Sequence, residues 1–132
     1  MIEAALLVTA LMFGGTILYS FGFAAFVFTA LPAETAGPLI RRAFPHFYLF
    51  VLGMSVIGAA LTFAFDGFAA ILLGLIAATT VIARQIVMPA VNAATDAGAK
   101  GRFKFLHTLS VIITLAHIGV AGYLIVRIAA LV

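Results

Sequence analysis

Four long apolar segments alternate with short polar stretches along the chain. They cover residues 4–31, 44–65, 68–91 and 103–130. Each is close to or longer than the ~20 residues that a helix needs to cross the hydrocarbon core of a bilayer. None shows the residue-by-residue alternation of a membrane barrel strand. The pattern therefore predicts an all-α fold, a single-domain four-helix transmembrane bundle whose helices run up and down in antiparallel order.

The polar stretches between these segments differ in length. The turn at Asp66 is tight, so the second and third spans are expected to be adjacent. Residues 32–43 form a longer connection with two prolines, Pro32 and Pro38, and we expect a short segment there that lies at the membrane interface. Residues 92–104 contain Gly98 and Gly101, which are typical signals for the end of a helix.

The composition is that of an integral membrane protein. Of the 132 residues, 66% are hydrophobic and 8% are charged, whereas a soluble domain is roughly half apolar and about a quarter charged. The lipid bilayer is therefore the first partner that we expect. Cysteine is absent, which excludes disulfides, thiolate metal sites and cysteine nucleophiles. No HExxH, P-loop, GxGxxG or GxSxG motif occurs and the four carboxylates are scattered, so no catalytic site is expected.

The cations predict the orientation of the bundle. With four spans, the first and third connections share one side of the membrane, and five cations lie there, whereas the other side holds only Arg127. The positive-inside rule places both connections in the cytoplasm and both termini outside, and we expect a bacterial inner membrane. No basic stripe is present, so a nucleic-acid partner is not expected. The five cations are Arg41, Arg42, Lys100, Arg102 and Lys104.

A cluster of polar residues is expected near the cytoplasmic ends of the second, third and fourth spans. Arg84 lies inside the third span, where an arginine costs roughly 3 kcal/mol or more unless it snorkels to the interface or finds partners. Two interpretations stay open: Arg84 snorkels, aided by Asp96 as a counter-ion, or it contacts an anion, a proton path or a haem propionate. The predicted cluster consists of His46, Arg84, Gln85, Asp96, His107 and Ser110.

The fourth span carries a stripe of polar residues on one helical face. Its members, spaced by three and four residues, are His107, Ser110, Thr114 and His117. The two histidines lie about 15 Å apart along the helix, so they cannot bind the same metal ion or haem iron. We expect His117 to be a neutral imidazole that is hydrogen-bonded across a helix seam. A second stripe, which lies in the first span and is expected to serve packing, consists of Thr9, Thr16 and Ser20.

Two sequence segments resemble a known family. Residues 14–47 contain a paired glycine followed by F-x-x-L-P-x-E-x-A-G, and residues 84–110 contain F-x-x-L-H-x-x-S at the start of the fourth span. Together they resemble the DUF4149 family of four-span membrane proteins of unknown function, which includes the human transmembrane protein associated with cisplatin resistance. The chain departs from that family at residues 23–28, FAAFVF, where the family tends to have a proline.

The resemblance implies an architecture rather than a reaction. A weaker likeness, to small helical membrane proteins of the CopD and HemJ type, rests on the four-span layout and the GG-x-x-x-Y opening. Some of those proteins bind haem or copper through histidines, but the likeness implies no ligand here. By motif position, the DUF4149 resemblance implies polar roles for Glu34, His107 and Ser110, and roles in shape for Gly15, Gly37, Pro45 and Pro89.

Three classes of function remain open from the sequence. The first is a non-enzymatic membrane protein that handles a solute or supports a larger membrane assembly. The second is a redox membrane protein that binds haem b through His107, with His46 as the other axial ligand. The third is a structural accessory subunit, in a homo-oligomer or a larger complex, whose polar stripe is buried against a partner.

Overall fold

The computed structural model describes residues 1–132 and is entirely helical. Four helices of 29 or 30 residues are long and apolar enough to cross a membrane, which confirms the predicted all-α architecture with four spans. The second and fourth spans are single α-helices, whereas the first and third each contain a π-helical segment between α-helical parts. The elements, in chain order, are α1 (Ile2–Ile17), η1 (Leu18–Phe23), α2 (Ala24–Ala30), α3 (Ala33–Thr62), α4 (Gly67–Ile82), η2 (Ala83–Val87), α5 (Met88–Asp96) and α6 (Lys100–Ala129).

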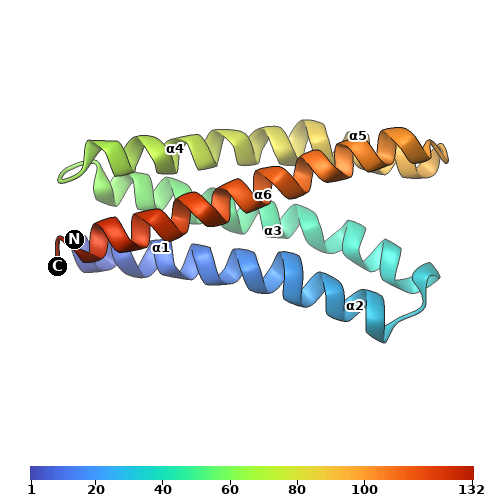
Figure 1. The fold of residues 1–132 in the computed structure, drawn as a ribbon, viewed down its shortest axis with the longest axis horizontal. Helices are drawn as coiled ribbons and strands as arrows, with labels where there is room; N and C mark the ends of the chain where they lie inside the picture. The colour runs from blue at the N-terminus through green and yellow to red at the C-terminus, as the bar shows by residue number, and fades with distance from the viewer.

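The connections divide the bundle into two ends. Both chain termini and the α3–α4 turn lie at one end, the terminal end, and the other two connections lie at the opposite end, the loop end (Figure 1). α1 packs against both α3 and α6, and α3 packs along α4, so α3 and α6 occupy opposite corners. At the loop end, α2 packs on α3 and α5 packs on α6. We call these two units the α2–α3 pair and the α5–α6 pair.

The first connection is much shorter than the sequence predicts. The prediction of a separate segment at residues 32–43 is wrong, because α3 runs without a break from Ala33 to Thr62. Only Leu31 and Pro32, both with extended backbone, separate it from α2. Two prolines inside α3 do not end the helix. In a bilayer the alternative to a helix is a row of unpaired peptide groups, so a proline that removes one hydrogen bond is tolerated.

The third connection is also shorter than expected. The predicted connection at residues 92–104 contracts to residues 97–99, between the end of α5 and the start of α6. Gly98 ends α5 with a positive φ of 65°, and the amide of Ala99 donates to the carbonyl of Ala94 at 3.0 Å. This is the bonding of a Schellman motif, which favours glycine. Gly101, the other predicted stop signal, lies inside α6 instead.

Hydroxyl side chains are buried in the bundle together with its apolar core. Each buried threonine or serine donates to a carbonyl three or four residues earlier in its own helix, so none is left unpaired. Two members of the first-span stripe belong to this set, and Ser20, the third, donates in the same way to Thr16. The hydroxyls of this stripe are therefore satisfied within their own helix. The buried threonine and serine residues are Thr9, Thr16, Ser55, Thr62 and Thr80.

Gly15 of α1 lies directly against the side chain of Phe50 from α3. A Cβ atom added there would lie 2.7 Å from the ring of Phe50, whereas a Cβ added at the neighbouring Gly14 would meet nothing within 4 Å. The aromatic ring of Phe50 therefore fills the space that a side chain at Gly15 would need. The two adjacent glycines of α1 therefore form a test position and a control, one against a side chain and one exposed.

Gly15→Ala is expected to destabilise the bundle by about 1–2 kcal/mol, because the Phe50 ring must move. Gly14→Ala should be neutral or stabilising by up to about 1 kcal/mol, since alanine favours a helix more than glycine does. Unfolding of both variants in detergent micelles, followed by circular dichroism, measures the difference. Equal stabilities for the two variants would contradict this close contact.

Candidate functional site

Two π segments and a proline lie at the same depth in the bundle. Tyr19 in η1, Pro45 in α3 and Arg84 in η2 are each about 12 residues from the loop end of their span, or roughly 18 Å at the helical rise. In a π segment the backbone hydrogen bonds span five residues and not four, and such segments frequently occur at functional sites. We call Tyr19, Ala43, Pro45 and Arg84 the Pro45 layer.

Two side-chain hydrogen bonds join the Pro45 layer. The hydroxyl of Tyr19 donates to the carbonyl of Ala43 at 2.9 Å, and Nε of Arg84 donates to the carbonyl of Pro45 at 3.2 Å. Residues two apart on a helix are separated by about 200° around its axis, so these carbonyls lie on opposite sides of α3. The backbone of α3 around its proline therefore accepts one bond from each π segment.

Aromatic packing holds Tyr19 in place. Its ring stacks on Phe47, with centroids 5.2 Å apart and an interplanar angle of 19°, and meets the edge of Phe44 at 5.8 Å. Phe23, one turn later in η1, lies 4.9 Å from the same ring. Phe47 is buried, so the Tyr19 ring packs against the core while its hydroxyl reaches the α3 backbone. The Tyr19 side of the layer is thus fixed by packing as well as by a hydrogen bond.

Arg84 is half-buried and is held by neutral acceptors alone. Besides the bond to Pro45, its Nη1 donates to Oε1 of Gln85 at 2.8 Å. No carboxylate lies within ion-pair distance of Arg84. The expected counter-ion, Asp96, pairs instead with Arg41 through contacts of 2.9 and 3.2 Å. Asp96 lies about 18 Å further along the same span, beyond the reach of an arginine side chain.

The Arg41–Asp96 ion pair links the two helix pairs at the loop end. Arg41 belongs to α3 and Asp96 ends α5, and Nη2 of Arg41 also donates to the carbonyl of Asn92 at 3.5 Å. Both side chains are exposed, at 40% and 65%. An exposed pair contributes little to stability, so this contact is a weak link between the α2–α3 pair and the α5–α6 pair.

The other members of the predicted cluster lie apart from Arg84. His46 and His107 are exposed, and no hydrogen bond joins either imidazole to the layer. The His107 ring stacks on Phe103 at 5.4 Å, and the hydroxyl of Ser110 donates to the backbone carbonyl of His107. Both side chains are exposed and they lie about 9 Å apart in depth, so these residues do not fit a haem held between His46 and His107 inside the bundle. No group of three or more acidic or histidine side chains is arranged to bind a metal ion.

His117 makes a hydrogen bond across the seam between α4 and α6, in agreement with the sequence. Its Nε2 lies 2.6 Å from Oγ1 of Thr79, and this hydroxyl also lies 2.8 Å from the carbonyl of Leu75. A carbonyl only accepts, so the consistent assignment has Thr79 donate to Leu75 and accept from the Nε2–H of His117. Thr114, on the same stripe, donates to the carbonyl of Ser110 within its own helix.

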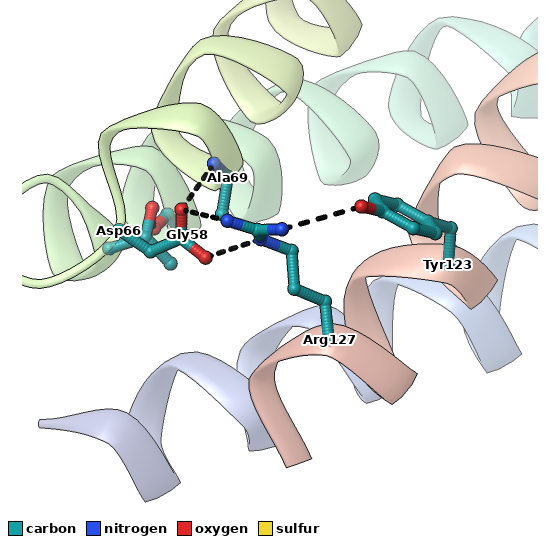
Figure 2. A network of polar contacts seen from close by, with 6 residues as sticks. Gly58, Asp66, Ala69, Tyr123 and Arg127 are labelled. Carbon is teal, nitrogen blue, oxygen red and sulfur yellow. Dashed lines mark hydrogen bonds and ion pairs between the residues drawn. The ribbon is translucent and has the colours of Figure 1, made fainter. Parts of the chain in front are cut away.

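A second polar site, at the terminal end, is absent from the predicted set. Figure 2 shows Arg127 of α6 forking onto the carboxylate of Asp66, with Nε 2.6 Å from Oδ2 and Nη2 3.1 Å from Oδ1. Oδ1 also accepts from the amide of Ala69, which caps the N-terminus of α4. Nη1 of Arg127 donates to the hydroxyl of Tyr123 at 3.4 Å, and its guanidinium lies 5.1 Å from the centroid of the Phe68 ring.

Asp66 is buried, and the Arg127 guanidinium, which donates to its carboxylate, holds the pKa of Asp66 below its usual range. The two residues join the α3–α4 turn to the end of α6. The sequence places both on the same side of the membrane, and an aspartate directly before a glycine-led helix is a recognisable N-cap signal. Their pairing depends on the way α6 crosses the bundle, which no local pattern shows.

The fold defines an integral membrane protein with four helical spans. Within that class the chain belongs to the DUF4149 family, because the model of this domain of unknown function matches residues 7–100. The match contains the whole Pro45 layer and ends at the first residue of α6. Neither the curated proteins nor the solved structures give a match to the chain.

Asp66→Asn is expected to lower the melting temperature by a few degrees at pH 7, because asparagine keeps the helix cap but loses the ion pair. Arg127 lowers the folded-state pKa of Asp66, so this stabilisation is present above the unfolded value of about 4 and is lost as pH falls through the folded value. The gap between wild type and variant should therefore close below about pH 4. Thermal melts from pH 7 to pH 2 measure this difference in melting temperature. A difference that does not change with pH would exclude the Asp66–Arg127 pair as its cause.

Proposed function

We propose that the chain handles a small polar solute at the Pro45 layer and does not catalyse a reaction there. The observation that carries this proposal is Arg84. For a span centred in the bilayer, it lies roughly 10 Å inside the hydrocarbon boundary, because a 30-residue helix is longer than the hydrocarbon core. A charged group at that depth is rare and is by default a functional candidate.

A role in packing alone explains Arg84 poorly. The buried hydroxyls and glycines already bring the helices close together. The bonds of Arg84 to Pro45 and Gln85 satisfy two of its donors and compensate none of its charge. The π segments and Pro45 interrupt the regular hydrogen bonding of three spans at this depth. Such interruptions are tolerated at membrane depth where they are buried in protein or line a polar cavity.

The loop end supplies the route to the layer in this proposal. There the α2–α3 pair and the α5–α6 pair are linked by the exposed Arg41–Asp96 contact, so a small separation of the pairs would admit water and solute. We propose that this end faces the cytoplasm of a bacterial inner membrane, with both termini outside. The five cations at the loop end support that orientation.

A specific observation favours a second candidate, support of a membrane assembly. The buried residues of α6 are confined to its last third: Ala121, Leu124 and Ile128. The first two thirds of this helix pack only partly against the bundle, as at the half-buried His117, and their exposed side chains, including His107, face lipid or another chain. A foreign protein that purifies with the chain at fixed stoichiometry in mild detergent would support this alternative.

Cysteine labelling tests whether the Pro45 layer is hydrated from the loop end. The chain contains no cysteine, so single substitutions report without background. Gln85→Cys replaces the side chain that accepts a hydrogen bond from Arg84, and Ile86→Cys, also exposed and next to it on the same π segment, is a control at a position without that bond. A membrane-impermeant maleimide should label Gln85→Cys from the cytoplasmic side only and should leave Ile86→Cys unlabelled. Failure to label Gln85→Cys from either side would refute a hydrated path.

A further inference from the structure

Each carboxylate of the chain lies away from Arg84. Glu3 contacts the N-terminal amine at 3.6 Å, and Asp66 and Asp96 pair with other arginines. Glu34 forms no ion pair and lies in the first turn of α3, about 16 Å along that helix from Pro45. No counter-ion for Arg84 is therefore available within the chain.

The guanidinium of Arg84 also keeps most of its donors free. A guanidinium has five N–H groups and stays protonated in proteins. Nε and one hydrogen of Nη1 are used, and Nη2 makes no hydrogen bond. The two existing bonds hold the plane of the group against α3, so its free donors have a fixed direction. Paired N–H groups of a fixed guanidinium match the two oxygens of a carboxylate or phosphate group.

We infer that Arg84 binds an oxyanion, a phosphate or carboxylate group, which supplies its missing counter-ion at membrane depth. This inference rests on the proposed function and names the class of its ligand. The group belongs either to a free solute or to the headgroup of an anionic lipid that enters between the two helix pairs at the loop end. Both sources present the same chemistry to Arg84, and a polar site near the cytoplasmic face is a recognised position for anionic headgroups.

The first experiment measures binding of free oxyanions. The protein, purified in a neutral detergent and stripped of lipid, is melted over a titration of sodium phosphate or acetate in which chloride keeps the ionic strength constant. Ligand that binds only the folded state raises the melting temperature with concentration. We expect a rise for wild type and for Arg42→Gln, a control that removes one exposed arginine without a side-chain contact. Arg84→Gln should show no rise.

The second experiment asks for lipid. The same proteins are mixed with equal amounts of phosphatidylglycerol and phosphatidylcholine in micelles, and native mass spectrometry counts the lipid that remains bound. A headgroup at Arg84 predicts that wild type and Arg42→Gln retain phosphatidylglycerol preferentially, several-fold more than Arg84→Gln does. If Arg84→Gln does not fold, Arg84→Lys replaces it as the test variant. Lysine keeps the charge but lacks the paired donors, so Arg84→Lys should bind more weakly than wild type in both experiments.

The outcomes separate the sources and the two proposals. A response to phosphate or acetate alone identifies a solute site, and selective retention of phosphatidylglycerol alone identifies a headgroup site. An equal response of wild type and the Arg84 variants in both experiments would overturn the inference. Labelling of Gln85→Cys together with that result would leave a hydrated path intact and would overturn the oxyanion assignment alone.

Discussion

The structure depends on one constraint: hydrocarbon offers no hydrogen bonds, so every polar group inside the bilayer must find its partner in the protein. The constraint explains why the spans are helices and why α3 continues through two prolines. It explains why each buried threonine and serine hydroxyl donates to a carbonyl of its own helix. It also explains the Pro45 layer, where a tyrosine and an arginine from two other spans donate to carbonyls of the proline-containing helix.

The same constraint gives the two ends of the bundle different characters. At the terminal end a buried aspartate caps α4 and accepts a forked arginine, so α6 is tied to the α3–α4 turn. At the loop end the corresponding contact between Arg41 and Asp96 is exposed to solvent and screened. Because the bundle is joined firmly at the terminal end and weakly at the loop end, we expect its helices to separate most easily at the loop end. Arg84 lies closer to that end than to the terminal end, 12 residues from the end of α5 and 17 from the start of α4.

The sequence predicts the four spans well because apolar runs of this length leave a helical bundle as the natural solution. It misplaces the boundaries near residues 32–43 and 92–104, since prolines and polar residues that end helices in water do not do so here. It singles out Arg84 as a candidate because an arginine inside a span is costly, and the structure places Gln85, another member of the predicted cluster, in hydrogen-bond contact with it. It does not predict the partners, because Tyr19, Pro45 and Asp66 are brought to their contacts by helix crossing. The sequence also predicts a shared depth for His46 and His107, which is wrong: His46 lies about 20 Å and His107 about 10 Å from the loop end of their helices, because α3 begins at Ala33 and not near residue 44.

The central claim is that Arg84 is held inside the bilayer by the backbone of α3, and its most direct test is an internuclear distance. Solid-state NMR in lipid bilayers, with carbonyl-labelled proline and nitrogen-labelled arginine, measures the dipolar coupling between the Pro45 carbonyl carbon and Nε of Arg84. Subtraction of the same spectrum from Arg84→Lys removes the other proline–arginine pairs. The structure predicts a separation of about 4 Å, as for any N–H donor on a carbonyl. If no coupling depends on Arg84, its guanidinium does not lie on the Pro45 carbonyl, and the claim is contradicted.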